Sequence, residues 1–444
     1  MGGGLMQLVA YGAQDIYLTG NPQITFFKVV YRRHTNFSME AIKQTFNGNA
    51  SVTGSTMTAT ISRNGDLVSN LWLDVVLKSG GMGIAGGNIL NWTNNTGHAF
   101  VKECEVEIGG QRIDRHYSQW LDIWNEVSDH DKKEWHGLNK HTDKGGYLTD
   151  GLPNVAAPDN LQLYVPLKFW FCRNPGLALP LIALQYHEVN IKIITRNINA
   201  LVNRHDPDGD PRNRTLGTVN PVVELWADYI YLDTDERRRF AQVSHEYLIE
   251  QLQRVTGSTT GAAQKNITLN YNHPVKELLW VIQDKRLVTE NLAVGGDYDS
   301  SLNINGIGNG SETANNNDYF TYLTHETPHA ENIFGTSAAE GFTTMKLKLN
   351  GHDRFKERKA SYFRTCQMIQ SGHRVPTKHI YGYSFALKPE EHQPSGTCNF
   401  SRIDNAQMVF GAVGGTSAAT ISVYAVNYNV LRIMSGMGGL AYSN

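Results

Sequence analysis

The sequence predicts an all-β protein built as two antiparallel sandwiches in tandem. Apolar and polar residues alternate in several segments, tight hairpin signals follow two of these segments, and the second half of the chain weakly repeats the first. The chain has 444 residues, which is too long for one sandwich but suits two domains with long loops.

The alternation is clearest in three segments in which every second residue is apolar. These segments are residues 71–77, 102–108 and 345–349. Such alternation is typical of strands with one face in a core and the other in solvent. Gly109-Gly110 and Asn350-Gly351 directly follow the second and third segments. Both dipeptides provide the positive φ angles that a two-residue hairpin turn needs.

Few helices are expected. Apolar residues recur at helical spacing within 118–128, which predicts a short helix there. Thr234 is expected to cap a second short helix, with Asp235 and Glu236 in its first turn. The strand predicted at 223–231, just before this helix, would close the first sandwich.

The two halves of the chain resemble each other at two places. Residues 67–78 resemble 274–285, and residues 108–112 resemble 349–353. The second pair is further apart in the sequence than the first, so the second half must carry a longer insertion between the two strands. Residues 286–341, rich in Gly, Asn, Ser and Thr, are that insertion, and a loop of this length is usually functional or mobile.

The composition argues against several classes of function. The formal net charge of −2 argues against direct nucleic-acid binding, and no segment has the ~18 consecutive apolar residues that a membrane span needs. The N-terminus does not resemble a signal peptide, so we expect synthesis in the cytosol. The four cysteines are not paired at short spacing and are expected to be isolated thiols.

Three short motifs suggest chemistry but lack the structural context it requires. Residues 81–86 match the Gly-x-Gly-x-x-Gly dinucleotide motif, but no helix is predicted after them. Residues 325–329 match His-Glu-x-x-His, but Pro328 would disrupt the helix that a zinc site needs. Residues 206–210 lack the Gly and Glu of a calcium loop. We therefore expect no catalytic residue, metal or cofactor.

Eight Asn-x-Ser/Thr sequons occur in the chain: Asn36, Asn49, Asn91, Asn94, Asn213, Asn266, Asn309 and Asn399. Acceptor asparagines must be exposed, so Asn91, Asn94 and Asn309, in expected loops, are the glycosylation candidates. A protein made in the cytosol would not meet the host's usual glycosylation machinery, so unmodified asparagines are the alternative.

Longer segments resemble a known family. The N-terminal run LVAYGAQDIYLTGNPQITFFK at 8–28 is the most extensive, and further matching segments reach the C-terminal strands. These are residues 61–66, 232–240, 245–249, 383–390 and 393–402. Together they resemble the major capsid protein of nucleocytoplasmic large DNA viruses, especially the chlorella-virus type. The insertion at 286–341 shows no matching pattern.

The resemblance implies a double jelly roll, with two eight-stranded sandwiches, in a homotrimer that tiles the icosahedral shell of the virion. It implies an N-terminal arm at 1–30, a first jelly roll at 31–235 and a second at 236–444. The arm would face neighbouring capsomers or minor capsid and penton proteins, above an inner membrane that the chain does not span. The loops at 79–100 and 286–341 would face outward.

Three other functions stay open at this point. The chain could be a carbohydrate-binding or host-attachment jelly roll, a minor or vertex capsid component, or an enzyme that uses one of the short motifs. Abundance in the virion and the oligomeric state of the purified protein distinguish these possibilities.

Two strand faces of opposite charge suggest a contact. The outward face of 102–108 carries Glu103, Glu105 and Glu107, and that of 345–349 carries Lys346 and Lys348. We hypothesise that these faces meet, within or between protomers, and set orientation more than affinity. The alternative is two unrelated faces in solvent.

Overall fold

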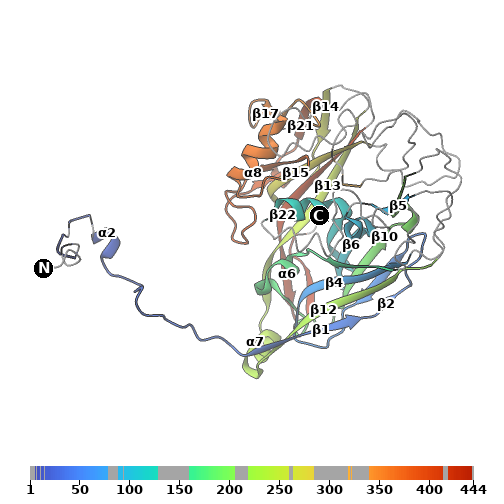
Figure 1. The fold of residues 1–444 in the computed structure, drawn as a ribbon. Coiled ribbons are helices and arrows are strands. Elements are labelled where there is room, and N and C mark those ends of the chain that lie inside the picture. The colour runs from blue at the N-terminus through green and yellow to red at the C-terminus, as the bar shows by residue number, and fades with distance from the viewer. Residues whose placement is uncertain are drawn as a thin grey trace. The chain divides into compact units, whose positions relative to one another are not determined.

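Strands from the first half of the chain form two antiparallel sheets that face each other across a core (Figure 1). One, called the β4 sheet, has the order β1-β12-β4-β8, with β9 beside β4. The other, the β6 sheet, has the order β2-β3-β10-β6-β7. The bounds are β1 (Phe37–Gln44), β2 (Phe46–Asn47), β3 (Thr56–Thr60), β4 (Leu67–Lys78), β6 (Val101–Ile108), β7 (Gln111–Tyr117), β8 (Asn160–Pro166), β9 (Leu179–Pro180), β10 (Val189–Thr195) and β12 (Val222–Leu232), with β5 (Ile89–Trp92) and β11 (Val202–His205) in a separate two-stranded sheet.

Strands from the second half form a further pair of sheets. The β15 sheet has the order β13-β22-β15-β19, with β20 beside β15 and β23 beside β22. The β16 sheet has the order β14-β21-β16-β17, with β18 also beside β16. The bounds are β13 (His245–Thr259), β14 (Gln264–Thr268), β15 (Pro274–Asp284), β16 (Thr344–Leu349), β17 (His352–Asp353), β18 (Arg358–Lys359), β19 (Ile380–Ser384), β20 (Cys398–Asn399), β21 (Ala406–Ala412), β22 (Ala419–Met434) and β23 (Met437–Leu440).

The computed structural model describes most of the chain. The described residues are 6, 8–10, 12–14, 16–78, 89–93, 95–128, 160–205, 219–259, 264–284, 319, 320, 322, 340–413 and 419–442. Residues 38–444 form one compact unit, and residues 1–37 form another. Because both sandwiches lie in the larger unit, the domain boundary at 235/236 stays a prediction; it falls within the helix α7.

The two sandwiches have the same topology. In chain order, β1, β3, β4, β6, β7, β8, β10 and β12 correspond to β13, β14, β15, β16, β17, β19, β21 and β22. Eight strands therefore occupy matching places in each sandwich, as predicted. The sequence repeat falls on corresponding strands, since 67–78 is β4 and 274–284 is β15.

Period-two alternation explains the cores. In β4, Leu71, Leu73, Val75 and Leu77 are buried while the residues between them are half-exposed. Each fully buried aliphatic side chain contributes roughly 1.5–3 kcal/mol through its removal from water. In the second sandwich Trp280 lies in the core between Phe363 and Tyr381, with ring centroids 5.4 and 6.1 Å away.

Both predicted hairpin turns are confirmed. Gly109 and Gly110, between β6 and β7, have φ of 58° and 80°, and Asn350 and Gly351, between β16 and β17, have 50° and 83°. A Cβ atom at Gly109 would also collide with the His187 ring. Glycine is therefore required there by both backbone conformation and space.

The helix predicted at 118–128 is confirmed as α4 (Ser118–Val127), which is almost entirely buried. The second, α7 (Thr234–Gln242), is also present, but the predicted cap is wrong. Asp233 is the N-cap, and its carboxylate accepts a hydrogen bond of 2.7 Å from the Thr234 amide. The other helices are short: α2 (Ile16–Thr19), α3 (Thr96–Phe100), α6 (Trp170–Arg173), α8 (Gln367–Gln370), the 3-10 turns η1 (Pro175–Leu177), η2 (Ile198–Leu201) and η5 (Phe400–Arg402), and the π-helical turn η4 (Tyr362–Cys366).

The two long loops are only partly described, and several of their described side chains are buried. All five residues of α3, at the end of the 79–100 loop, are buried, and the expectation that this loop faces the outside of the shell stays a prediction. Its segment 79–88 lies outside the described residues. In the 286–341 insertion, Tyr319, Phe320 and Tyr322 are buried as well. Apolar aromatic side chains explain this burial, because exposing them would cost free energy.

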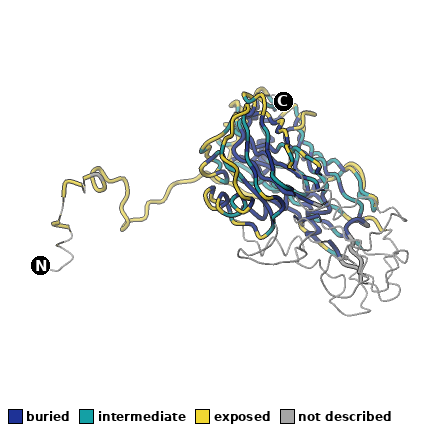
Figure 2. The backbone as a smooth tube through the Cα atoms, turned by 90° about the horizontal axis from the view of Figure 1, so that it is seen from above, coloured by how far each residue is buried: buried dark blue, intermediate teal, exposed yellow. Residues whose placement is uncertain are grey.

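Residues 1–37 are exposed wherever they are described (Figure 2). Apart from the single turn α2, little of this segment is helical or extended in a sheet. Several large apolar side chains are in contact with solvent, including Phe26, Phe27, Val29 and Val30. In the described part of the whole chain, no helix has the length and apolar character needed to cross a bilayer.

Candidate functional site: the junction between the sandwiches

The two sandwiches meet where β13 runs beside β7. The amide of Leu252 donates to Asp114 Oδ1 over 3.0 Å, and the Gln251 side chain donates to the Ile113 carbonyl. Further along, the Arg254 guanidinium lies 3.8 Å from the centroid of the Tyr117 ring. Through these side-chain contacts, the last strand of the β6 sheet lies beside the first strand of the β15 sheet.

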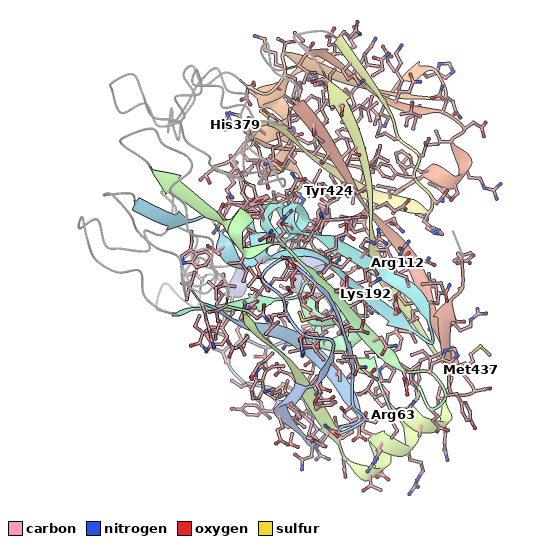
Figure 3. The ribbon with its side chains drawn as sticks, turned by 90° about the vertical axis from the view of Figure 1, so that its right-hand side faces the viewer. Arg63, Arg112, Lys192, His379, Tyr424 and Met437 are labelled. Carbon is pink, nitrogen blue, oxygen red and sulfur yellow. The ribbon has the colours of Figure 1, made fainter. Side chains whose placement is uncertain are left out.

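Helix α4 covers the outer face of the β15 sheet. The Trp120 and Tyr424 rings lie 5.7 Å apart, and Tyr424 donates to Gln119 over 2.9 Å. Leu279 and Val281 also join the apolar cluster of the first sandwich, whereas alternate residues of β15 join the core of the second. The β15 sheet is therefore buried on both faces, and Tyr424 lies at this boundary (Figure 3).

A charged triad links the sandwiches. Glu250 on β13 accepts from Arg173 on α6 over 2.9 Å and from Lys276 on β15 over 2.6 Å. Lys276 is fully buried and also donates to the Pro389 carbonyl over 2.5 Å. Burial raises the pKa of Glu250, but Arg173 and Lys276 outweigh it and lower the pKa overall. Glu250 is thus held in its ionised form between two cations.

A second polar cluster centres on Asp122 of α4. Its carboxylate accepts from Lys378 over 2.6 Å, from Tyr322 over 2.8 Å and from Asn95 over 2.9 Å. Lys378 also lies 5.3 Å from the Phe320 ring. The cluster thus joins the first sandwich, the second sandwich and the insertion.

The insertion is held at a second point by Tyr319. Its hydroxyl donates to the Ala200 carbonyl over 3.1 Å, and the Arg196 guanidinium lies 4.3 Å from its ring centroid. Gln283 of β15 donates to the Tyr319 carbonyl over 2.9 Å. Tyr319, Phe320 and Tyr322, here called the insertion anchor, therefore contact both sandwiches.

Comparison with known proteins places this architecture in a family. The family described as "Major capsid protein N-terminus" matches residues 25–233, and "Large eukaryotic DNA virus major capsid protein" matches residues 236–439. The chain belongs to the family of large eukaryotic DNA virus major capsid proteins. This capsid protein is 47% identical to the major capsid protein of Pyramimonas orientalis virus and 43% identical to that of Paramecium bursaria Chlorella virus 1, each covered over 100% of both chains.

Solved structures agree. The capsid protein matches a chain of the "PBCV-1 virus capsid, quasi-atomic model" with a TM-score of 0.74 and 39% identity, over 95% of this chain and 100% of that one. The predicted double jelly-roll fold and the resemblance to the capsid family are both confirmed. As a major capsid protein, the chain belongs to the capsid shell of the virion.

In the capsid protein, the Glu105 side chain points away from the core of its sandwich, as predicted, but it is buried rather than in solvent. Arg115 on β7 and Lys192 on β10 form ion pairs with its carboxylate, and Arg112 lies 3.7 Å away. Figure 3 places Arg112 and Lys192 along this strand region. Three cations from neighbouring strands thus enclose a carboxylate that the alternation pattern alone assigned to solvent.

The other residues of the charge-face hypothesis lie on their predicted strands. Glu103 and Glu107 are half-buried on β6, and Lys346 and Lys348 are half-exposed on β16. Glu103 pairs with Arg115 of its own sheet, and Lys346 with Asp353 of its own sheet. The ion pairs of Glu103 and Lys346 thus form within their own sheets. A contact between the two faces stays a prediction.

The glycosylation candidates remain predictions. Asn91 belongs to β5, where its backbone pairs with Asn203, so the expected loop is a short strand at this position. Asn94 and Asn309 lie outside the described residues, as do the three motifs at 81–86, 206–210 and 325–329. Among the described residues, no group of three or more His, Cys, Asp or Glu could hold a metal ion.

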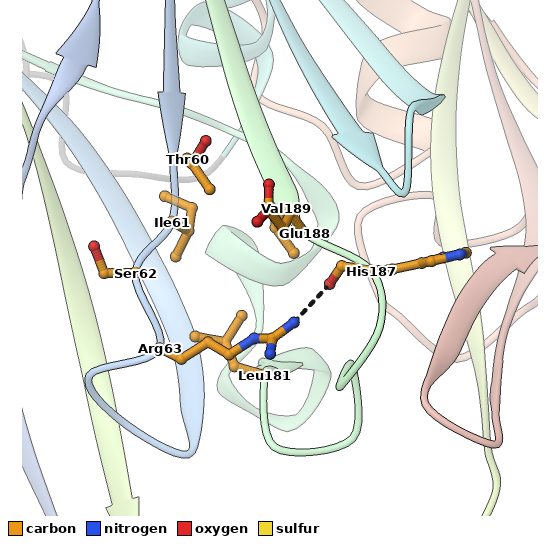
Figure 4. Close-up of a pocket in the computed structure, with 8 residues that line it drawn as sticks. All are labelled: Thr60, Ile61, Ser62, Arg63, Leu181, His187, Glu188 and Val189. Carbon is orange, nitrogen blue, oxygen red and sulfur yellow. Dashed lines mark hydrogen bonds between the residues drawn. The ribbon is translucent and has the colours of Figure 1, made fainter.

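A hollow of about 220 Å³ lies beside Arg63 (Figure 4). The guanidinium of Arg63 donates to the carbonyls of Leu184 and His187, at 2.7 and 3.3 Å. The His187 ring in turn lies 2.9 Å from the Gly438 carbonyl of the second sandwich. Of the polar groups of this hollow, His187 therefore contacts the second sandwich.

His373 supplies a pH-dependent element of the second sandwich. Its two ring nitrogens lie 2.7 Å from Glu277 and 2.6 Å from Glu390. Burial lowers the pKa of His373, but the two carboxylates outweigh it and raise the pKa to about 9. The ring is therefore positively charged at neutral pH.

We predict that this charge makes stability fall as pH rises. Because the folded pKa exceeds the unfolded value of 6.5, the contribution is complete below pH 6.5 and is lost as pH rises through 9. The loss is about 3 kcal/mol at most. Urea unfolding of wild type and His373→Gln at pH 6 and pH 9 measures it. An equal loss in both proteins would contradict the assignment.

Proposed function

We propose that this chain is the repeating unit of a homotrimeric capsomer that tiles an icosahedral shell. The observation that carries the proposal is the pair of sandwiches with matching strand order, joined by a buried junction. Three copies of such a chain place six similar sandwiches around one axis. A closed trimer then has nearly sixfold edges and packs in a hexagonal array.

The role is structural rather than enzymatic. Its partners are copies of itself, neighbouring capsomers, and minor capsid and penton proteins, in a shell above an inner membrane that the chain does not span. The exposed apolar residues of 1–37, such as Phe26 and Phe27, support contact with such partners, because large exposed apolar segments mark interaction sites.

Sizing and electron microscopy of the purified protein test this proposal. We expect a particle of three times the monomer mass of 49.5 kDa that forms hexagonal sheets, and a chain that is abundant in purified virions. A monomer that binds sugars would instead identify an attachment protein. A trace amount in virions would identify a minor or vertex component. Either result overturns the proposal.

A further inference from the structure

The outer faces of the two corresponding sheets differ in burial. On β15, Leu279 and Val281 point away from the core of their own sandwich and are buried against the first sandwich. Under the repeat that aligns 67–78 with 274–285, these positions correspond to Trp72 and Asp74 on β4, which are only half-buried. In the described part of the chain, the β4 sheet thus leaves half-exposed the face that the β15 sheet buries, and we call it the open face.

This open face has the composition of a contact surface. Trp72 and Trp226 are directly opposite each other on β4 and β12, and Tyr164 on β8 is 40% exposed. Asp74 and Asp228 lie on the same face, near the aromatic side chains. Tryptophan and tyrosine are enriched at protein interfaces because they bury large areas at small entropic cost.

The segment that covers the β15 sheet has a counterpart. Residues 111–127, comprising β7 and α4, follow β6, and of these α4 lies on the β15 sheet while β7 runs beside β13. In the second sandwich, residues 352–370, from β17 to α8, follow β16 in the same way. We call 352–370 the second-half cover segment. It exposes Ile369, which is 67% accessible, and the free thiol of Cys366.

The cover segment and the open face have complementary character. The segment contains five basic residues and only two acidic ones: Arg354, Lys356, Arg358, Lys359 and Arg364 against Asp353 and Glu357. Asp353 pairs with Lys346 and Arg364 pairs with Glu340, which leaves four exposed basic residues, Arg354, Lys356, Arg358 and Lys359, against the charge of Glu357. The open face carries three carboxylates, Asp74, Glu224 and Asp228, with Lys43 and Lys78 at its margins. Such complementarity orients association.

We propose that the second-half cover segment of one copy packs on the open face of the β4 sheet of the next copy. The contact would reproduce between chains the arrangement that 111–127 makes within the chain. It joins two different surfaces, so it propagates in one direction and closes into a ring after three copies. This inference rests on the proposed trimer and names the surfaces that form its seam.

Charge reversal tests the seam. Asp74→Lys with Asp228→Lys makes both surfaces basic, and Lys356→Glu with Lys359→Glu makes both acidic. We expect each double variant to raise the trimer dissociation constant at least tenfold in sedimentation experiments, and the combined fourfold variant to recover most of that loss. The exposed pair Lys388 and Glu391 supplies matched controls, Lys388→Glu and Glu391→Lys, which should leave the trimer intact.

Cross-linking gives a second measurement that needs no repulsive charge. A bifunctional maleimide should join Cys366 of one copy to a cysteine placed at Tyr164 of the next, giving chains of twice the monomer mass. Wild type and Lys388→Cys should give no such product. If the wild type is not a trimer, the proposed function fails. If it is a trimer that resists charge reversal and shows no specific cross-link, only the seam is wrong.

Discussion

Replacing Lys276 by methionine should lower the free energy of unfolding by about 3 kcal/mol, because it leaves the buried carboxylate of Glu250 with one cation instead of two. The Pro389 carbonyl also loses its donor. The midpoint of urea unfolding, taken at one protein concentration, measures the effect. A fixed concentration matters because association stabilises the folded chain.

A second substitution tests the cause of this loss. In Lys276→Met with Glu250→Gln, the buried carboxylate that lost one of its two cations becomes a neutral amide, while Arg173 keeps its contact with the Trp124 ring, so we expect at least half of the stability to return. Lys388→Ala, at an exposed ion pair, should change the stability by less than about 1 kcal/mol. If Lys276→Met costs no more than this control, the triad does not stabilise the junction.

Local patterns predicted the strands and turns correctly. The alternation in β4 and β16 arises because each strand buries one face. The turns at Gly109-Gly110 and Asn350-Gly351 depend only on residues adjacent in the sequence. The cap of α7 was missed by one residue because Asp233 and Thr234 are both good capping residues. The extended backbone conformation of Asp233, with φ of −65° and ψ of 156°, identifies it as the residue before the helix.

The junction could not be predicted in the same way, because it depends on which sheets pack together. Glu105 alternates like a solvent-facing residue, yet cations on β7 and β10 enclose it. One signal was present: Lys276 and Glu277 are adjacent charged residues directly before the apolar run at 278–282. Charges in such a strand need buried partners, which indicates a polar contact between packed elements.

The position of the insertion also could not be predicted from the sequence. Its composition predicted a long exposed loop, but Tyr319, Phe320 and Tyr322 form an aromatic group within a segment rich in Gly and Asn. Such a group cannot be placed until its partners are known, since Asp122 and Ala200 lie far away in sequence. The anchor attaches its own part of the insertion to both sandwiches.

Replacing Asp122 by alanine should release this anchor. The change removes the shared acceptor of Lys378, Tyr322 and Asn95, and leaves a largely buried ammonium group without its counterion. We expect a loss of about 3 kcal/mol in the free energy of unfolding. Hydrogen exchange of the peptide that contains residues 319–322 should also accelerate, because its side-chain attachment to α4 is lost.

Two variants separate the roles of charge and hydrogen bonding. Asp122→Asn keeps one acceptor and the side-chain volume, so its loss should be smaller than that of the alanine variant. Thr377→Val removes a single bond to Glu126, 3.2 Å long, near the same helix, and should cost about 1 kcal/mol without changing exchange at 319–322. The anchor would lose its assigned role if Asp122→Ala destabilised the chain while exchange in this peptide stayed at the wild-type rate, because Asp122 would then act only through Lys378.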